Sequence, residues 1–255
     1  MLQVCLNGSR HHAECPWLPV GAEELAAEAR RAVDAGAEDI HLHPKDADGR
    51  DTLDPEAVGD AVRAVRRAVG PRIGVGVTTG AWAEPDPRRR AGLVRSWTAV
   101  PDHASVNWHE DGADLVAEAL TDRGIGIEAG LYSGTDALRR FAASPFVDGV
   151  LRVLAEVTDT RVAEAAGVGR RMVEDVSAVT AAPVLLHGAD GTAWPVLVTA
   201  AALGVDTRIG LEDTLILPDG TPARGNAPLL RAAREILHRH GGPVRPGRGP
   251  ASQSP

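Results

Sequence analysis

The chain alternates short apolar runs with longer segments of helical periodicity, and this alternation limits its possible folds more than any other feature. Eight runs have the composition of strands, at residues 3–6, 39–43, 72–77, 103–106, 126–128, 150–153, 183–186 and 207–210. Most are continuously apolar, which is typical of parallel strands covered on both faces. The sequence therefore predicts a parallel sheet flanked by helices.

Segments of helical periodicity separate these runs, and two of them carry clear start signals. Asp54 and Pro55 have the residue types of an N-cap and a first-turn proline, and Gly70 marks the end of that helix. Asp86 and Pro87 open another helix in the same way. Further periodic stretches lie near residues 25–37, 115–120, 161–179, 193–203 and 229–237.

Eight strand–helix units of about 32 residues each match the size and rhythm of a single-domain (β/α)8 TIM barrel of the α/β class. A doubly wound open sheet is the alternative, and it usually has a glycine-rich phosphate loop after its first strand. The run Asn7-Gly8-Ser9-Arg10 is not such a loop. We expect a catalytic barrel over residues 1–240 and a disordered tail over 241–255, which is rich in Gly, Pro and Ser and lacks periodicity.

The composition excludes several classes of protein. Apolar residues make up 44% of the chain, too many for a disordered protein and enough for a sizeable core. The net charge of −8 disfavours a nucleic-acid-binding surface. The start lacks a signal-peptide pattern, and the longest apolar stretch, 195–205, is too short to span a bilayer. Since Cys5 and Cys15 cannot staple a chain of this length, we expect reduced thiols in a cytoplasmic protein.

The end of the second predicted strand indicates a metal site. His41 and His43 are two residues apart, so both side chains project from one face toward the mouth of the barrel. Glu212 follows the eighth strand, only two strands away in a closed barrel. Two histidines and one carboxylate leave positions open for water and substrate, as in catalytic zinc sites. The same ligand set suits Fe²⁺ or another divalent metal, and core histidines bonded to the backbone are the non-metal interpretation.

Charged residues at other strand ends are candidates for catalysis. Arg208 and Asp213 flank the third metal ligand and can steer a substrate carboxylate and move a proton, although such clusters are also common on plain surfaces. Glu128 is expected at the end of the fifth strand, where a carboxylate needs a cation or a proton. We expect Arg208 to be its partner across the barrel.

Smaller polar residues follow other strands. Thr78 and Thr79 follow the third strand and Asn107 follows the fourth, where hydroxyls and an amide can bind substrate oxygens or simply cap loops. His187 follows the seventh strand and is either a supporting group or a surface residue.

Two separated runs, 41–50 and 208–213, resemble those of the β-keto acid cleavage enzymes, whose best-known activity is 3-keto-5-aminohexanoate cleavage. They carry the patterns His-x-His-x-x-Asp and Arg-x-x-x-Glu-Asp, which are specific as a pair. The likeness extends from residue 4 to about 230 and includes 78–80, 104–107, 126–128 and 215–226.

The resemblance implies a zinc-dependent barrel enzyme that cleaves a β-keto acid with acetyl-CoA, giving acetoacetate and a new CoA thioester. In this family, the residues matching His41, His43 and Glu212 would bind zinc. Asp213 would be the base, positioned by Arg208, with Glu128 supporting that arginine. Residues matching Thr79, with Thr78 as the neighbouring choice, and Asn107 would bind substrate. Related enzymes tend to be homo-oligomers, so a homotetramer is expected.

Two departures from the family pattern bear on the substrate. Lys45 stands where the family usually has arginine. Arg10 lies in a run that carries an acidic residue in the lysine-fermentation members, so it should bind substrate and favour a neutral or acidic β-keto acid over an amino-substituted one. The alternatives are a metal-dependent aldolase or hydrolase without CoA, and a non-catalytic metal-binding protein.

Overall fold

Eight parallel strands form the centre of the molecule in the computed structural model, which describes residues 1–158 and 160–240. The strands are β1 Leu2–Cys5, β2 Asp39–Leu42, β3 Gly74–Thr78, β4 His103–Asn107, β5 Gly126–Tyr132, β6 Arg152–Val157, β7 Val184–Gly188 and β8 Thr207–Ile209. Neighbours pair in the order β7-β6-β5-β4-β3-β2-β1-β8. A parallel bridge between Leu185 and Asp206 joins β7 to the start of β8 and closes the ring. The predicted TIM barrel is confirmed, and the open-sheet alternative is wrong.

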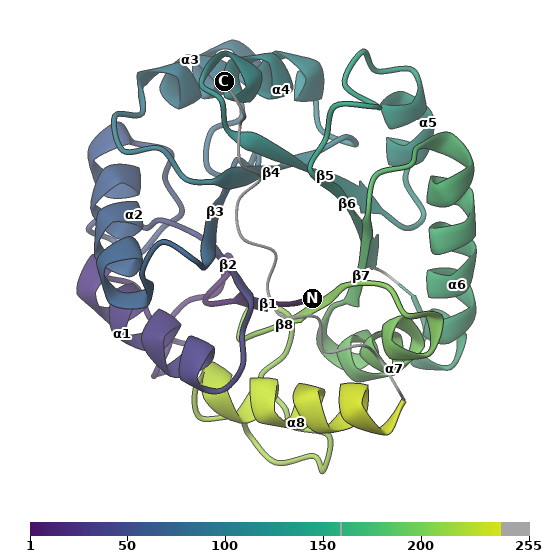
Figure 1. Cartoon of the computed structure of the whole chain (residues 1–255). Coiled ribbons are helices and arrows are strands. Elements are labelled where there is room, and N and C mark those ends of the chain that lie inside the picture. The colour runs from purple at the N-terminus through teal and green to yellow at the C-terminus, as the bar shows by residue number, and fades with distance from the viewer. Residues whose placement is uncertain (159, 241–255) are drawn as a thin grey trace.

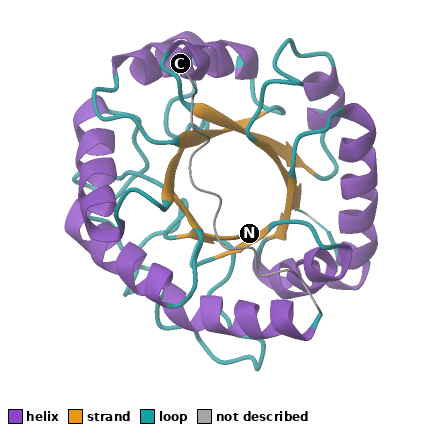
Figure 2. Cartoon of the chain, in the orientation of Figure 1, coloured by secondary structure: helices purple, strands orange, loops and turns teal. Residues whose placement is uncertain are grey.

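Helices surround this ring on its outer face (Figures 1 and 2). They are α1 Ala22–Asp34, α2 Pro55–Val69, α3 Pro87–Ser96, α4 Ala113–Asp122, α5 Ala137–Ala142, α6 Val162–Val179, η1 Asp190–Thr192, α7 Ala193–Leu203 and α8 Asn226–Arg239. The sequence did not predict α5, because its six residues are too few to show a periodic pattern. In the described residues no helix has the length and apolar character needed to cross a membrane.

Helix α2 shows how local sequence fixes an element. The Asp54 carboxylate accepts hydrogen bonds from the backbone N–H groups of Glu56 (2.9 Å) and Ala57 (3.2 Å), as an N-cap should. Gly70 ends the helix with φ 78°, a conformation that favours glycine. Val58 and Val62 are buried on the face that packs inward. Both predicted ends of this helix are confirmed.

The strands have an apolar outer face and a polar interior. Val4 and Ile40 are fully buried and belong to the hydrophobic core between the strands and the surrounding helices. Gln3 alternates with Val4, and its Nε2 donates across the barrel to Glu128 Oε1 at 2.9 Å. Such contacts between strands that are not neighbours require side chains that point into the barrel. The expectation of continuously apolar strands is wrong for several of them, because β2 and β4 alternate apolar residues with polar or ionisable ones, and β6 and β8 also contain ionisable residues.

Glu128 was predicted to end the fifth strand, and this prediction is wrong. β5 continues through four more residues to Tyr132, and the Glu128 side chain is completely buried inside the barrel. The predicted range was too short because Ala129 and Gly130 are weak strand formers that here sit in a fully paired central strand.

Cys5 and Cys15 are both buried free thiols, as expected. The tail predicted over 241–255 lies outside the described residues.

Candidate active site

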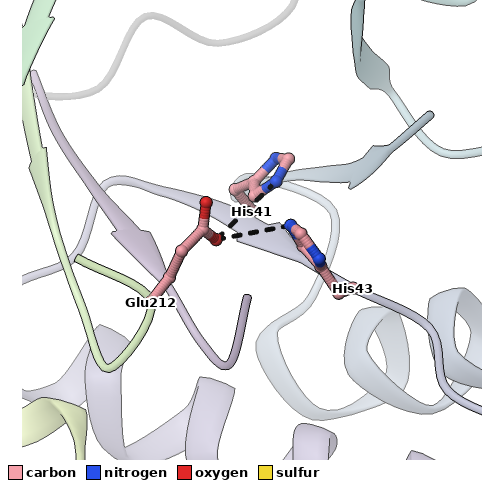
Figure 3. A group of neighbouring side chains, drawn as sticks. All are labelled: His41, His43 and Glu212. Carbon is pink, nitrogen blue, oxygen red and sulfur yellow. Dashed lines mark ion pairs between the residues drawn. The ribbon is translucent and has the colours of Figure 1, made fainter. Parts of the chain in front are cut away.

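His41, His43 and Glu212 converge at the carboxyl ends of the strands (Figure 3). Glu212 Oε2 lies 3.9 Å from His41 Nε2 and 3.6 Å from His43 Nε2. The two imidazole rings meet edge to face with their centroids 5.3 Å apart. The structure thus brings together three residues that are separated by up to 171 positions in the chain.

These three groups fit a divalent metal ion. All their donor atoms lie within 4.8 Å of one another, and both histidines are buried. Glu212 Oε2 is buried without a hydrogen-bond partner among the described residues. Burial lowers the pKa of His41 to about 4, so its ring is neutral and offers a lone pair. Ligands about 2.0–2.2 Å from a tetrahedral metal lie on the order of 3.3 Å from each other, close to the spacings seen here.

Two glycines let Glu212 approach this position. Gly8 after β1 has φ 59°, and a Cβ built there would lie 2.5 Å from Glu212 Cγ. A Cβ at Gly210 would lie 1.9 Å from the backbone oxygen of Cys5. The close contact of the β1 and β8 ends therefore requires glycine at both positions.

His43 is oriented by a carboxylate that the sequence analysis did not identify. Its Nδ1 lies 2.7 Å from Asp51 Oδ2, and the indole Nε1 of Trp82 donates to the same oxygen at 2.6 Å. Lys45 Nζ donates to Asp51 Oδ1 at 2.5 Å. Burial raises the pKa of Asp51, but the hydrogen bond from His43 and the charge and hydrogen bond of Lys45 outweigh it and hold that pKa below its usual range.

Arg208 connects the metal group to Asp213. Its Nη2 donates to Glu212 Oε1 at 2.7 Å, and its Nε donates to Asp213 Oδ1 at 3.1 Å. Asp213 Oδ2 is buried and has no hydrogen-bond partner in the described part of the chain. Burial raises the pKa of Asp213 to about 7 against the lowering effect of Arg208. Arg208 therefore holds one oxygen of this carboxylate, and the other oxygen is unpaired among the described residues.

The predicted pairing of Glu128 with Arg208 is wrong. Glu128 Oε1 accepts from Arg152 Nε at 2.7 Å, and Glu128 Oε2 lies 3.1 Å from His103 Nδ1. Asp39 completes this buried group, with Oδ2 3.0 Å from Arg152 Nη2 and Oδ1 3.0 Å from His103 Nε2. The correction follows from strand register, because Glu128 on β5 lies directly opposite Arg152 on the adjacent strand β6. Its remaining link to the metal group is His41 Nδ1, 3.8 Å from Glu128 Oε2.

A cavity of about 300 Å³ opens beside the metal group. Its ionisable lining consists of one imidazole, one phenol, two guanidinium groups and five carboxylates: His43, Tyr132, Arg10, Arg208, Glu14, Glu156, Asp190, Glu212 and Asp213. Glu156 on β6 was missed by the sequence analysis, and burial raises its pKa to about 7. His187, whose role was left open, is buried behind this wall, with its nitrogens 3.6 Å from Glu156 Oε2 and 3.7 Å from Asp213 Oδ1.

The remaining predicted substrate-binding residues differ in their access to this cavity. Arg10 lines it, but its Nη2 is paired with Asp190 at 2.5 Å. Thr79 Oγ1 donates to the Ser105 carbonyl, and Thr78 Oγ1 accepts from the backbone of Gly80. Asn107 Nδ2 donates to Glu110 Oε1 at 2.9 Å. These last three side chains are buried and engaged within the protein, and none is part of the cavity wall.

Fold and site together define a (β/α)8-barrel enzyme with a buried group of histidines and carboxylates at the carboxyl ends of its strands. The family model for the beta-keto acid cleavage enzymes matches residues 1–247. The chain therefore belongs to the beta-keto acid cleavage enzyme family.

Two curated relatives of this chain are both named 3-keto-5-aminohexanoate cleavage enzyme. The 3-keto-5-aminohexanoate cleavage enzyme of Acetoanaerobium sticklandii is 25% identical over 247 residues, which cover 90% of this chain and 88% of the relative. The enzyme of that name from Fusobacterium nucleatum is 26% identical over 239 residues, covering 87% and 86% of the two chains.

Solved structures show the same fold at lower identity. The apo structure of ObcA superposes with a TM-score of 0.73 at 17% identity, over 89% of this chain and 63% of ObcA. The chain thus spans just under two thirds of the length of ObcA. A type I 3-dehydroquinate dehydratase from Clostridium difficile superposes with a TM-score of 0.62 at 13% identity, over 93% of this chain and 92% of that one.

Proposed function

We propose that this protein is a zinc-dependent β-keto acid cleavage enzyme that uses acetyl-CoA as co-substrate. The carboxylate and α-carbon of the β-keto acid would combine with the acetyl group of acetyl-CoA to give acetoacetate. The remaining acyl group of the β-keto acid would be transferred to the CoA that is set free, giving a new CoA thioester. The observation that carries the proposal is the convergence of His41, His43 and Glu212 beside the Arg208–Asp213 pair, at one cavity.

The three converging residues would hold the metal. Two histidines and one carboxylate leave coordination positions for a substrate, and a bound zinc ion would stabilise the negative oxygen of an enolate. Glu212 has a second task, because its Oε1 is tied to Arg208 while its Oε2 faces the histidines. Arg208 therefore sets the relative position of the metal group and the base.

Asp213 would act as the base. Arg208 holds its Oδ1, and the unpaired Oδ2 is the atom that would take or return the substrate proton. With a pKa of about 7, raised by burial, this carboxyl can exchange a proton near neutral pH. A guanidinium that binds two carboxylates also keeps the Asp213 side chain in one orientation.

CoA as a co-substrate is supported by family membership and by a structural neighbour. ObcA, which shares the barrel, has been solved in a ternary complex with a C4-CoA adduct and oxalate. ObcA has also been solved in a binary complex with oxaloacetate, and that structure superposes on this chain with a TM-score of 0.67. Use of a keto acid and a CoA thioester by this chain is our proposal.

The acyl group is proposed to be neutral. Arg10 is the residue that led us to expect a neutral or acidic substrate, and it lines the cavity. Asp190 pairs with its Nη2, and Glu14 lies 3.5 Å from its Nη1, so its positive charge is already balanced. Arg10 therefore offers little attraction to a second anion, which argues against an acidic acyl group. Its balanced charge also repels an amino group less, so the comparison with an amino-substituted substrate is the decisive test. Thr78, Thr79 and Asn107 remain proposed substrate-binding residues that would have to exchange internal hydrogen bonds for substrate contacts.

The test combines metal analysis with a substrate screen. The purified protein is assayed for bound metal and then for acetoacetate formation from a panel of β-keto acids with acetyl-CoA. H43A should lose both metal and turnover, whereas D213N should keep the metal and lose turnover. Comparing an uncharged β-keto acid with its amino-substituted analogue tests the proposed acyl group.

Other results would favour other functions. Turnover of keto acids without acetyl-CoA would indicate an aldolase or hydrolase, and bound metal with no turnover of any β-keto acid would indicate a metal-binding protein. Full activity of D213N would remove Asp213 from its role. A homotetramer is proposed on the family likeness, and a monomer in light scattering would refute it.

A further inference from the structure

The Asp51 carboxylate lies beside the metal group and takes no part in the proposed reaction. It is nevertheless hydrogen-bonded to three side chains. Its Oδ2 is shared by His43 Nδ1 at 2.7 Å and Trp82 Nε1 at 2.6 Å, and its Oδ1 accepts from Lys45 Nζ at 2.5 Å. The Asp51 side chain is only 5% exposed. It does not line the cavity, so it is placed to act on His43 and not on a substrate.

These contacts determine which nitrogen of His43 is free. An ionised carboxylate only accepts hydrogen bonds, so the hydrogen between His43 and Asp51 must be on Nδ1. In a neutral ring, the form that can bind a metal, the lone pair is then on Nε2, the nitrogen that faces Glu212 Oε2 at 3.6 Å. His41 has no such support, because its Nδ1 is without a hydrogen-bond partner in the described residues. The two candidate ligands are therefore held in different ways.

We propose that Asp51 is a positioning residue that fixes His43 as a metal ligand, an inference that rests on the proposed metal-dependent function. A carboxylate behind a ligating histidine fixes the ring orientation and tautomer and makes the nitrogen a stronger ligand, and its loss typically weakens metal binding 10–100-fold. Asp51 supplies this carboxylate from the loop between β2 and α2, eight residues beyond His43.

Lys45 and Trp82 complete the arrangement. Lys45 Nζ also donates to the backbone oxygen of Gly8 at 2.6 Å, so it ties the Asp51 carboxylate to the loop after β1. The Trp82 ring stacks on His43 with the centroids 5.9 Å apart and the planes 15° from parallel. Trp82 thus covers one face of the His43 ring and also donates to Asp51. The hydrogen bond to Asp51 restricts the His43 ring within its plane, and the stacked indole restricts it perpendicular to that plane.

Asp51 also has an ordinary structural role, because its backbone forms a bridge with Lys45 that closes the loop. A structural role alone predicts lower stability with unchanged metal affinity. A positioning role predicts lower metal affinity in a protein that still folds. Metal affinity measured on folded protein therefore distinguishes the two.

The experiment compares D51N with D48N, a matched control in the same loop. Asp48 is 68% exposed, and its carboxylate pairs with exposed Arg50. The zinc affinity of wild type, D51N and D48N is measured by competition with a chromophoric chelator, and the visible spectrum of each cobalt-substituted protein reports the ligand geometry. Thermal unfolding of the metal-free proteins checks that each is folded. D51N should bind zinc 10–100-fold more weakly with an altered cobalt spectrum, and D48N should match wild type.

A second variant keeps the proposal testable if D51N does not fold. D51E retains a carboxylate on a longer side chain and should bind zinc more tightly than D51N, or within about tenfold of wild type if D51N cannot be made. Zinc affinity and cobalt spectrum of D51N equal to those of wild type would overturn the positioning role while leaving the proposed function intact. Absence of zinc binding by wild type would instead overturn the proposed function.

Discussion

The charge on His103 makes the stability of this barrel depend on pH in the alkaline range. His103 is 2% exposed and lies between Asp39 and Glu128, with Arg152 bridging the same two carboxylates. Burial lowers the pKa of His103, but the charges of Glu128 and Asp39 outweigh burial and raise that pKa from 6.5 to about 10. The folded protein therefore keeps a proton that the unfolded chain releases above pH 6.5.

The size of the effect follows from linkage. Between the unfolded and folded pKa values the native state binds one more proton, so the free energy of unfolding falls by about 1.4 kcal/mol per pH unit. The stabilisation is complete below pH 6.5 and is lost as the pH rises through about 10. Between pH 7 and 9 the loss is on the order of 2–3 kcal/mol, a large part of the stability of an ordinary domain.

The assay compares wild type with H103Q by urea unfolding from pH 6 to 9.5. Glutamine keeps a hydrogen-bond donor but cannot carry the charge, so H103Q should be less stable at pH 7, and the difference should shrink by about 2 kcal/mol by pH 9. Both proteins are measured at equal metal content, so that effects of the metal site cancel. A difference that stays constant between pH 7 and 9 would refute the reasoning, because it would mean that His103 is not charged in the folded state.

Two further predictions concern backbone contact and the base. G210A should lose about 2–4 kcal/mol of unfolding free energy by thermal denaturation, because its Cβ would collide with the Cys5 carbonyl. G92A in helix α3 should gain up to about 1 kcal/mol, because among the described residues nothing outside its own helix lies within 4 Å of an added Cβ. Equal melting temperatures for the two variants would contradict this account. R208K should lower kcat roughly 10–100-fold at unchanged metal content, since one ammonium cannot hold both Glu212 and Asp213 in the observed geometry. Turnover within twofold of wild type would contradict it.

The architecture could be predicted from the sequence because its signals are local. Eight apolar runs, the Asp54 cap and the Gly70 stop each depend on neighbouring residues, and all are found in the structure. The errors lie where local preference is weak. β5 was predicted to end at Glu128 because the next residues have low strand propensity, and helix α5 was too short to show a period.

The candidate metal group was also predictable, for a topological reason. Once the barrel was inferred, strand ends had to meet at one mouth, so His41, His43 and Glu212 could be placed together from their positions in the chain. Asp51 and Glu156 were not found, because nothing in their sequence surroundings distinguishes them from other acidic residues.

The sequence by itself determined the order of the elements, the barrel fold and the strand ends that carry the candidate site. It could do so because periodicity and helix caps depend on adjacent residues, and the alternation of strands and helices implies a parallel topology. Only the tertiary structure decided the partners of each charged side chain. Glu128 binds Arg152 and His103 instead of Arg208, and Asp51 binds His43, because the register of β5 against β6 and the path of a loop set these distances. Strand register and loop path depend on the packing of the whole barrel, and no local pattern records them.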